Sequence, residues 1–320
     1  MAVYTIVSDE DLHGFLAEYD IGELLSCKGI AEGVENSNYL LHTSSGHYIL
    51  TLYEKRVDAK DLPFFLGLME HLANAGIRCP TPIHGRDGQA LRHLAGRPAA
   101  IVTFLDGICV NRSQPKHCRA LGESLAVMHI HGENFELRRP NALGVADWPL
   151  LFRETAPLAD TVMPGLKNLI DDELGYLAEF WPQDLKQGVI HADLFPDNVF
   201  FFHDTVSGFI DFYFACNDAL AYDLAICINA WCFERQGEFN ATKARALTQT
   251  YQNVRHLSQN DLDALPILCR GAAMRFLLTR LYDWLNKVNG ALVRPKDPKE
   301  YVERLRFHQK AGSAASYGLT

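Results

Sequence analysis

Hydrophobic and polar residues alternate with a period of two over much of the first third of the chain. Short turns separate these segments, which predict strands at residues 25–29, 38–42, 48–53, 89–94 and 99–104. One amphipathic segment, beginning at Asp61 and ending at Gly76, interrupts them and predicts a helix. The pattern therefore predicts an antiparallel sheet with one main helix, and the strand pattern stops at Gly107.

Beyond Gly107 the hydrophobic period changes from two to 3.6, which is typical of helices. The clearest helical segments are 115–129, 166–177 and 261–287. They surround one β-rich stretch, 189–212, with strands expected at 199–202 and 209–212. We therefore expect an α+β chain of two lobes, residues 1–107 and residues 108–320.

Charge and composition exclude several classes of protein. The chain has 39 acidic and 30 basic residues among 320, a formal net charge of −9, and no cluster of Lys or Arg, so nucleic acids and anionic membrane surfaces are not expected partners. Its apolar runs are of strand length and no signal sequence is recognised, so we expect a cytoplasmic protein. Eight cysteines without a C-x-x-C pair indicate reduced core thiols. The sequence does not predict the oligomeric state.

The β-rich stretch carries the strongest chemical pattern. His191, Asp193 and Asn198 form an H-x-D-x-x-x-x-N motif, and Asp211 follows on the next hairpin. Protein kinases use this order and spacing. There the first Asp orients and deprotonates the acceptor hydroxyl, while the Asn and the second Asp bind Mg²⁺ on the phosphates. The alternative is that Asp193 and Asn198 cap turns and that Asp211 is a hydrogen-bonded strand residue.

Two further segments are candidates for ATP binding. The loop 29–39 lies between two predicted strands, where glycines would let backbone N–H groups approach phosphates and asparagines would bond them or fix the turn. The segment 99–107 would be a hinge whose backbone bonds adenine. The candidate ATP-binding residues are Gly29, Gly33, Asn36, Asn38, Thr103, Phe104 and Leu105. An ordinary hairpin and a buried strand are the respective alternatives, and Asp223 near the start of an apolar helix is interpreted as a structural carboxylate.

At these motifs the chain resembles the aminoglycoside phosphotransferase and choline kinase superfamily, and within it the homoserine kinases. The resemblance runs over nearly the full chain and is carried by residues 29–39, 61–65, 96–100, 191–199, 210–218, 222–225, 229–233 and 278–284. It implies a two-lobed protein-kinase-like fold, with residues 1–107 covering ATP and residues 108–320 supplying catalysis. It also implies Mg²⁺-dependent transfer of the ATP γ-phosphate to L-homoserine, giving O-phospho-L-homoserine for threonine synthesis.

One position departs from the kinase pattern. Kinases carry a Lys on the third strand, paired with a Glu on the next helix, whereas this chain has Thr51 in a strand position expected to be half-buried, and no Glu where the partner should lie. Losing both partners avoids burying one charge alone. Lys28, Lys55 and Arg56 are candidates for the replacement phosphate clamp.

The acceptor site is the least determined part of the prediction. A zwitterionic amino acid needs an acid and a cation near Asp193, and Asp218, Arg275 and Arg280 are the candidates, with interhelix pairing as the alternative for both arginines. The substrate alternatives are choline, methylthioribose and an aminoglycoside. A nucleotide-binding regulatory pseudokinase is the alternative from another class, favoured by the missing Lys–Glu pair.

Overall fold

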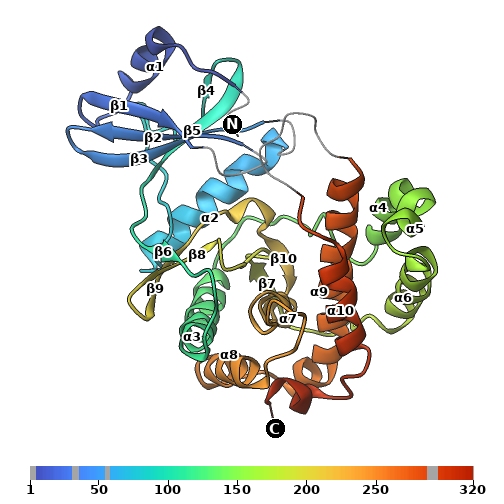
Figure 1. Cartoon of the computed structure of the whole chain (residues 1–320). Coiled ribbons are helices and arrows are strands. Elements are labelled where there is room, and N and C mark those ends of the chain that lie inside the picture. Colours follow the sequence, from blue (N-terminus) through green and yellow to red (C-terminus); the bar gives the residue numbers. More distant parts are fainter. Residues whose placement is uncertain (1–4, 31–35, 55–57, 287–294, 320) are drawn as a thin grey trace. The chain divides into compact units, whose positions relative to one another are not determined.

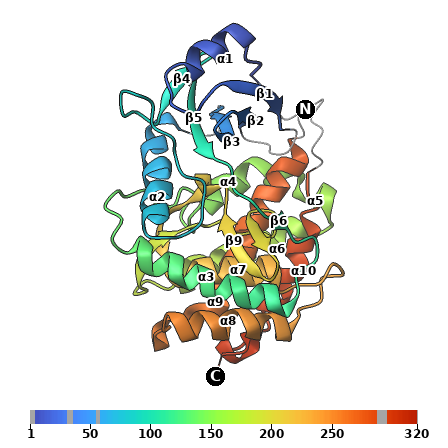
Figure 2. The same ribbon diagram turned by 90° about the vertical axis from the view of Figure 1, so that its left-hand side faces the viewer.

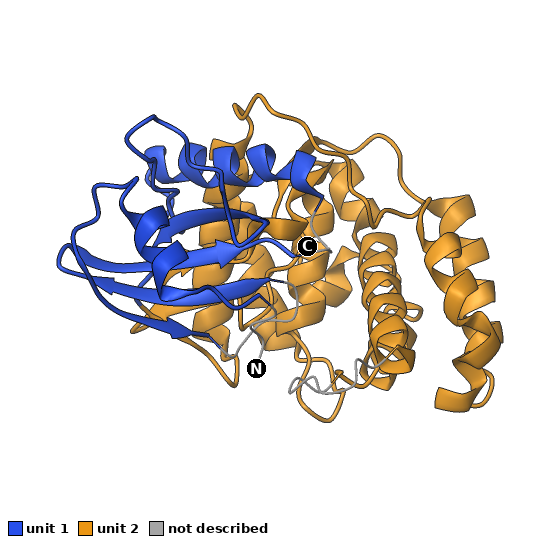
Figure 3. Ribbon diagram, turned by 90° about the horizontal axis from the view of Figure 1, so that it is seen from above, with its two compact units in different colours: residues 1–106, 288–294 blue, residues 107–287, 295–320 orange. Residues whose placement is uncertain are grey.

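Five antiparallel strands form the sheet of the first compact unit of the chain, in the order β1-β2-β3-β5-β4 (Figure 1). The structure, a computed structural model, describes residues 5–30, 36–54, 58–286 and 295–319. The first unit ends at Asp106 and the second begins at Gly107 (Figure 3). The elements of the first unit are α1 (Asp9–Leu16), β1 (Leu24–Gly29), β2 (Ser37–Thr43), β3 (Gly46–Leu52), a 3₁₀ turn η1 (Ala59–Asp61), α2 (Leu62–Asn74), β4 (Arg92–Leu94) and β5 (Arg97–Thr103).

One face of this sheet forms a core with α1. Leu12, Phe15 and Leu16 of α1 are buried with alternate residues of the strands, among them Leu41 of β2 and Leu50 of β3. Alternation along a strand sends the intervening residues to the opposite face. The predicted sheet and its one main helix are confirmed, whereas α1 is a second, shorter helix that the pattern did not predict.

The second unit contains most of the helices. They are α3 (Pro115–Gly132), α4 (Trp148–Thr155), η2 (Ala156–Leu158), α5 (Ala159–Val162), α6 (Leu166–Phe180), η3 (Phe212–Phe214), α7 (Leu220–Trp231), α8 (Ala241–Val254), α9 (Gln259–Leu285), α10 (Lys299–His308) and η4 (Ala314–Tyr317). Figure 2 shows α3 and α8 running side by side. At Gly122 of α3 the helices are so close that a Cβ atom would overlap the carbonyl oxygen of Leu247 of α8.

Two small sheets complete the second unit and carry the motif residues. β7 (Gln187–Ile190) pairs with β10 (Cys216–Ala219), and β8 (Val199–Phe202) lies between β6 (Ile108–Cys109) and β9 (Thr205–Phe209). The predicted strand at 209–212 was wrong in position. The strand ends at Phe209 because Asp211 adopts a left-handed conformation, φ +65°, and 212–214 form the 3₁₀ turn η3.

The cysteines and the helices test two more expectations. All eight cysteines are free thiols, as predicted. Six are buried, but Cys27 and Cys109 are exposed, so the prediction of core positions was wrong for these two. No helix within the described residues is long and apolar enough to span a bilayer.

Candidate active site

The loop between β7 and β8 brings two residues of the H-x-D-x-x-x-x-N motif into direct contact. The Asn198 amide nitrogen Nδ2 donates to the backbone carbonyl of Asp193 at 2.8 Å and to its carboxylate Oδ2 at 3.0 Å. A side chain that bonds both the backbone and the carboxylate of one residue restricts the orientation of that carboxylate. The loop therefore presents Asp193 in a fixed direction.

Strand pairing brings Asp211 to the same end of the β8–β9 hairpin. Val199 of β8 is paired with Phe209 of β9, and the Ile210 N–H donates to the Asn198 carbonyl at 3.0 Å. Asp211 is the next residue, and its Oδ1 atom is buried. The residues predicted to hold a metal thus lie on two adjacent backbones joined by a hydrogen bond, with oxygen atoms as the available donor type.

His191 ties the start of the loop to this hairpin. Its Nε2 atom lies 3.0 Å from the carbonyl oxygen of Ile210, the residue before Asp211. Burial lowers the pKa of His191 to about 4, so the imidazole is neutral near pH 7 and Nε2–H donates. His191 is therefore a structural link between the two motif segments, because its imidazole bonds to a backbone carbonyl of the hairpin.

Asp223 of α7 holds the start of the loop through hydrogen bonds to its backbone. Its Oδ2 accepts the His191 N–H at 2.7 Å and its Oδ1 accepts the Ala192 N–H at 2.9 Å. The interpretation of Asp223 as a structural carboxylate is confirmed by these bonds. Trp231, at the end of the same helix, adds a third bond, from Nε1 to the Leu194 carbonyl at 2.7 Å. Sequence reasoning missed Trp231, because nothing local indicates its partner.

A buried, uncharged histidine forms a hydrogen bond with the Asp223 carboxylate. His129 Nε2 lies 3.1 Å from Asp223 Oδ2, and His129 Nδ1 lies 2.8 Å from the Tyr251 hydroxyl. Burial lowers the pKa of His129, so the ring is neutral. Burial alone would raise the pKa of Asp223, but hydrogen bonds from His129 and His191 hold it below its ordinary value. Asp223 is therefore an ionised anchor.

The predicted acceptor residues occupy different surroundings. Asp218 of β10 is half-buried, and its Oδ2 accepts a hydrogen bond from Asn141 Nδ2 at 2.7 Å. Arg280 of α9 pairs with Glu300 of α10 at 2.7 Å, which is the interhelix alternative. Arg275 is buried and donates to the Ala192 carbonyl. Sequence reasoning missed Asn141, which is 77 residues from its partner.

In the first unit, two of the candidate asparagines bond to neighbouring protein groups. Asn36 Oδ1 accepts the Glu54 N–H at 3.3 Å, and Asn38 Oδ1 accepts the hydroxyl of Thr51 at 2.8 Å. These contacts tie the two asparagines to β3 and the residues just after it, and most of the predicted turn lies outside the described residues. Gly29 is the last residue of β1, and Gly33 lies outside the described residues.

The predicted hinge begins at the end of β5. The N–H of Thr103 donates to the Thr81 carbonyl at 2.9 Å, and the N–H of Phe104 donates to the His47 carbonyl at 3.3 Å. These two N–H groups are therefore already occupied by protein carbonyls. The Phe104 side chain is exposed and that of Leu105 is half-buried.

The position of the missing kinase lysine is more buried than the sequence suggested. A half-buried position was expected, but Thr51 is only 2% exposed. It is buried because it lies on the central strand β3, between β2 and β5. On α2 the predicted face, Phe64, Phe65 and Leu68, is buried as expected. Lys28 is exposed on β1, while Lys55 and Arg56 lie outside the described residues.

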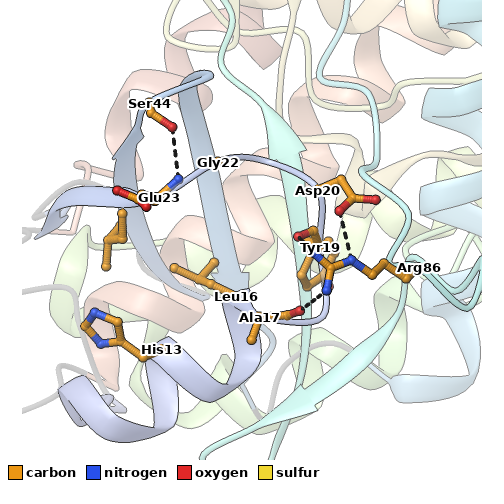
Figure 4. Close-up of a pocket in the computed structure, with 10 residues that line it drawn as sticks. His13, Leu16, Ala17, Tyr19, Asp20, Gly22, Glu23, Ser44 and Arg86 are labelled. Atoms are coloured by element: carbon orange, nitrogen blue, oxygen red, sulfur yellow. Dashed lines mark hydrogen bonds and ion pairs between the residues drawn. The ribbon is translucent and has the colours of Figure 1, made fainter.

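An open groove of about 830 Å³ lies beside α1 in the first unit (Figure 4). Its lining includes Asp20, Glu23 and Arg86. The Arg86 guanidinium is bonded to the Asp20 carboxylate at 2.8 Å and to the Ala17 carbonyl at 2.9 Å. None of the motif residues lines this groove, so it is not the catalytic site.

Comparison with known proteins identifies the class of protein. The sequence profile of the phosphotransferase enzyme family matches residues 26–257, and the chain belongs to that family. The chain is also similar in fold to an amicoumacin kinase solved with AMP-PNP and Ca²⁺, with a TM-score of 0.69, 15% identity and coverage of 95% of this chain and 93% of that one. The α+β kinase-like fold predicted from the sequence is thereby confirmed.

Full-length relatives then narrow the class. The chain is 63% identical over 319 residues to the homoserine kinase of Parvibaculum lavamentivorans, covering 100% of this chain and 99% of that protein. It is 62% identical over 320 residues to the homoserine kinase of Bradyrhizobium diazoefficiens, covering 100% and 98% respectively. The resemblance to the homoserine kinases within this phosphotransferase family is thereby confirmed.

Proposed function

We propose that this protein transfers the γ-phosphoryl group of ATP to the hydroxyl of L-homoserine, giving ADP and O-phospho-L-homoserine for threonine synthesis. The observation that supports this substrate is the 63% identity to a homoserine kinase over the full chain. The paired Asp193 and Asn198 support the reaction type, because phosphoryl transfer requires a carboxylate that orients the attacking hydroxyl.

Asp193 would act on the acceptor. Its carboxylate accepts the proton of the homoserine hydroxyl as the oxygen attacks the γ-phosphorus and the bond to the ADP oxygen breaks. Asn198 holds Oδ2 of that carboxylate through its amide. This bond restrains the carboxylate that receives the proton.

The donor set fits Mg²⁺. Asn198 turns its Nδ2 group towards Asp193, which leaves its amide oxygen for a cation, and Asp211 supplies a carboxylate with a buried oxygen. The described residues hold no group of three or more His, Cys, Asp or Glu side chains arranged for a metal ion. A Mg²⁺ site of this kind does not need three such side chains, since Mg²⁺ binds one or two protein oxygens together with phosphate oxygens and water. When bound it would neutralise charge on the ATP phosphates.

Nucleotide binding is assigned to the first unit. Gly29 and Gly33 would let backbone N–H groups approach the phosphates, and Asn36 and Asn38 would bond the phosphates or fix the turn. Backbone groups within 103–105 would bond adenine. Lys28 is a candidate cation for the phosphates, since it is exposed on the strand that leads to Gly29.

The acceptor subsite would use Asp218 for the homoserine ammonium. Asn141 holds one oxygen of this carboxylate, and the β7–β10 pairing, with Asp218 opposite Gly188, connects it to the strand that leads into the catalytic loop. Arg280 is the candidate cation for the homoserine carboxylate. Its side chain is 11% exposed, and its guanidinium would have to bind the substrate carboxylate and Glu300 at the same time.

The proposed reaction is tested by Mg²⁺-dependent ADP release from the full chain with L-homoserine, choline, methylthioribose and an aminoglycoside. We expect homoserine to be preferred by at least about 100-fold in kcat/KM and EDTA to abolish turnover. Asp193→Asn should lower kcat by about 10² to 10⁴ while ATP still binds. Asp197→Asn is the matched control, since this exposed carboxylate of the same loop pairs with Lys296.

Three results would contradict the proposal. Preference for another alcohol would reassign the substrate. ATP binding without transfer to any of the four alcohols would favour the regulatory pseudokinase. Near wild-type kcat in Asp193→Asn would remove Asp193 from the mechanism.

A second prediction concerns the ammonium subsite. Asp218→Asn keeps the size of the side chain and removes its charge, so the KM for homoserine should rise at least about tenfold while the KM for ATP changes little. Steady-state kinetics with each substrate varied in turn measures both constants. An unchanged homoserine KM would place the ammonium elsewhere.

A further inference from the structure

The peptide that joins Ala192 to Asp193 is held in an unfavourable conformation. Ala192 has φ +64°, in the left-handed region that disfavours residues with a Cβ atom. Its N–H donates to Asp223 Oδ1 at 2.9 Å, and its carbonyl accepts from Arg275 Nη1 at 2.5 Å. This carbonyl belongs to the peptide bond between Ala192 and Asp193. The hydrogen bond from Arg275 therefore restrains the orientation of the backbone at Asp193.

The anchor is a buried guanidinium. Arg275 is 2% exposed and lies against the rings of Phe276 and Phe214, with centroids 4.6 Å and 5.5 Å from its Cζ atom. No acidic side chain of the described residues forms an ion pair with it, and its Nε atom is buried without a hydrogen-bond partner there. Burying a charge without an opposite charge is costly, so packing alone does not account for an arginine at this position.

The anchor also comes from outside the segment shared with the broader family. The family profile ends at residue 257, and α9, which carries Arg275, begins at Gln259. The catalytic loop is thus held on one side by Asp223 of α7 and on the other by a helix beyond the matched segment. This arrangement gives α9 a direct connection to the catalytic residue.

We propose that Arg275 is a positioning residue, which acts through the Ala192 carbonyl to hold the left-handed turn and thereby to orient Asp193. The inference rests on the proposed phosphoryl transfer only in that the test measures the rate of this reaction. It also replaces the expectation that Arg275 binds the substrate carboxylate, since the arginine hydrogen bond is made to the loop.

The test combines a substitution at Arg275 with relief of the backbone strain. Arg275→Met should lower kcat by about tenfold or more and leave the KM values for homoserine and ATP within about threefold. Glycine adopts positive φ without a steric cost, so Ala192→Gly in the Arg275→Met background should recover most of the lost kcat. Ala192→Gly alone is the reference against which the double variant is compared.

Two companion variants make the result specific. Arg270→Met removes another arginine of α9, which pairs with Glu173 at 2.6 Å and covers the Tyr176 ring, and it should leave kcat unchanged and gain nothing from Ala192→Gly. Arg275→Lys keeps the charge and a single donor nitrogen, so it should give an intermediate kcat with the same rescue. It replaces Arg275→Met if that variant does not fold.

Two outcomes would overturn the proposal. A raised homoserine KM with unchanged kcat would return Arg275 to substrate binding. A loss of kcat that Ala192→Gly does not restore would make its role purely structural. The assay uses whichever alcohol the wild-type protein phosphorylates, or Mg²⁺-dependent ATP hydrolysis if it phosphorylates none, so failure of the homoserine assignment is a separate result.

Discussion

Thr51 and Asn38 bond to each other on one face of the first unit's sheet, at the position predicted to correspond to the kinase lysine. The hydroxyl of Thr51 donates to Asn38 Oδ1 at 2.8 Å, and the two residues are directly opposite in the β2–β3 register. A neutral pair therefore occupies this buried position. The only acid of α2, Glu70, is bonded to His84 and does not supply a partner for a cation here.

Thr51→Lys should consequently destabilise the free protein. The ammonium would be buried without an acidic partner, which lowers the melting temperature by several degrees. MgATP should restore part of this loss by mass action, and kcat should not increase. Calorimetry with and without MgATP measures the shift, and Ser26→Lys, at an exposed position of β1, is the control. A tenfold rise in activity with full stability would identify position 51 as an incomplete kinase clamp.

At the scale of elements, helix contacts determine how the catalytic loop is supported. α3 supplies His129, α7 supplies Asp223 and α8 supplies Tyr251, and these three side chains form one buried chain of hydrogen bonds. The close approach of α3 and α8 at Gly122 sets the spacing of two of these helices. A change in that spacing would strain the chain of hydrogen bonds.

Gly122→Ala tests this contact. The added methyl group would overlap the Leu247 carbonyl oxygen, so the two helices must shift, and we expect a loss of about 1–3 kcal/mol in unfolding free energy. The matched control is Gly175→Ala on α6, where no atom lies within 4 Å of an added Cβ. There the better helix propensity of alanine should stabilise the protein by up to about 1 kcal/mol. Equal effects of the two substitutions in urea denaturation would contradict the close contact.

For the whole molecule, buried neutral histidines make stability depend on pH. Burial lowers the pKa of His191 to about 4, that of His308 to about 3, and that of His129 below its ordinary 6.5. Because each folded pKa lies below the unfolded value, the unfolded chain takes up protons first as the pH falls. Stability from these groups is therefore complete above pH 6.5 and decreases towards the folded pKa values.

We expect the unfolding free energy to fall between pH 6.5 and 5, approaching about 1.4 kcal/mol per pH unit for each of His191 and His308 at the acid end, with a further decrease from His129. Urea denaturation at several pH values measures the slope. His308→Gln should reduce the slope by the share of one histidine. A flat profile over this range would show that the histidines are protonated in the folded protein.

The sequence by itself determined the main elements and the motif residues of this protein. Period-two and period-3.6 patterns located the sheet and the main helices, because burial on one face imposes the same spacing on the chain. The spacing of Asp193, Asn198 and Asp211 indicated phosphoryl transfer, because these residues are joined by a short loop and one hairpin. The short sequence separation between these residues was enough to predict that they lie close together.

The tertiary structure alone decided which side chains support that motif. Asp223, Trp231 and Arg275 reach the catalytic loop from 31 to 83 residues away, and Asn141 reaches Asp218 from 77. No local pattern encodes such partners, because they depend on how α7, α9 and the small sheets pack. The strand predicted at 209–212 failed for a related reason, since the left-handed turn at Asp211 exists only where the loop and hairpin meet. Packing between distant elements, and not propensity along the chain, determines these features.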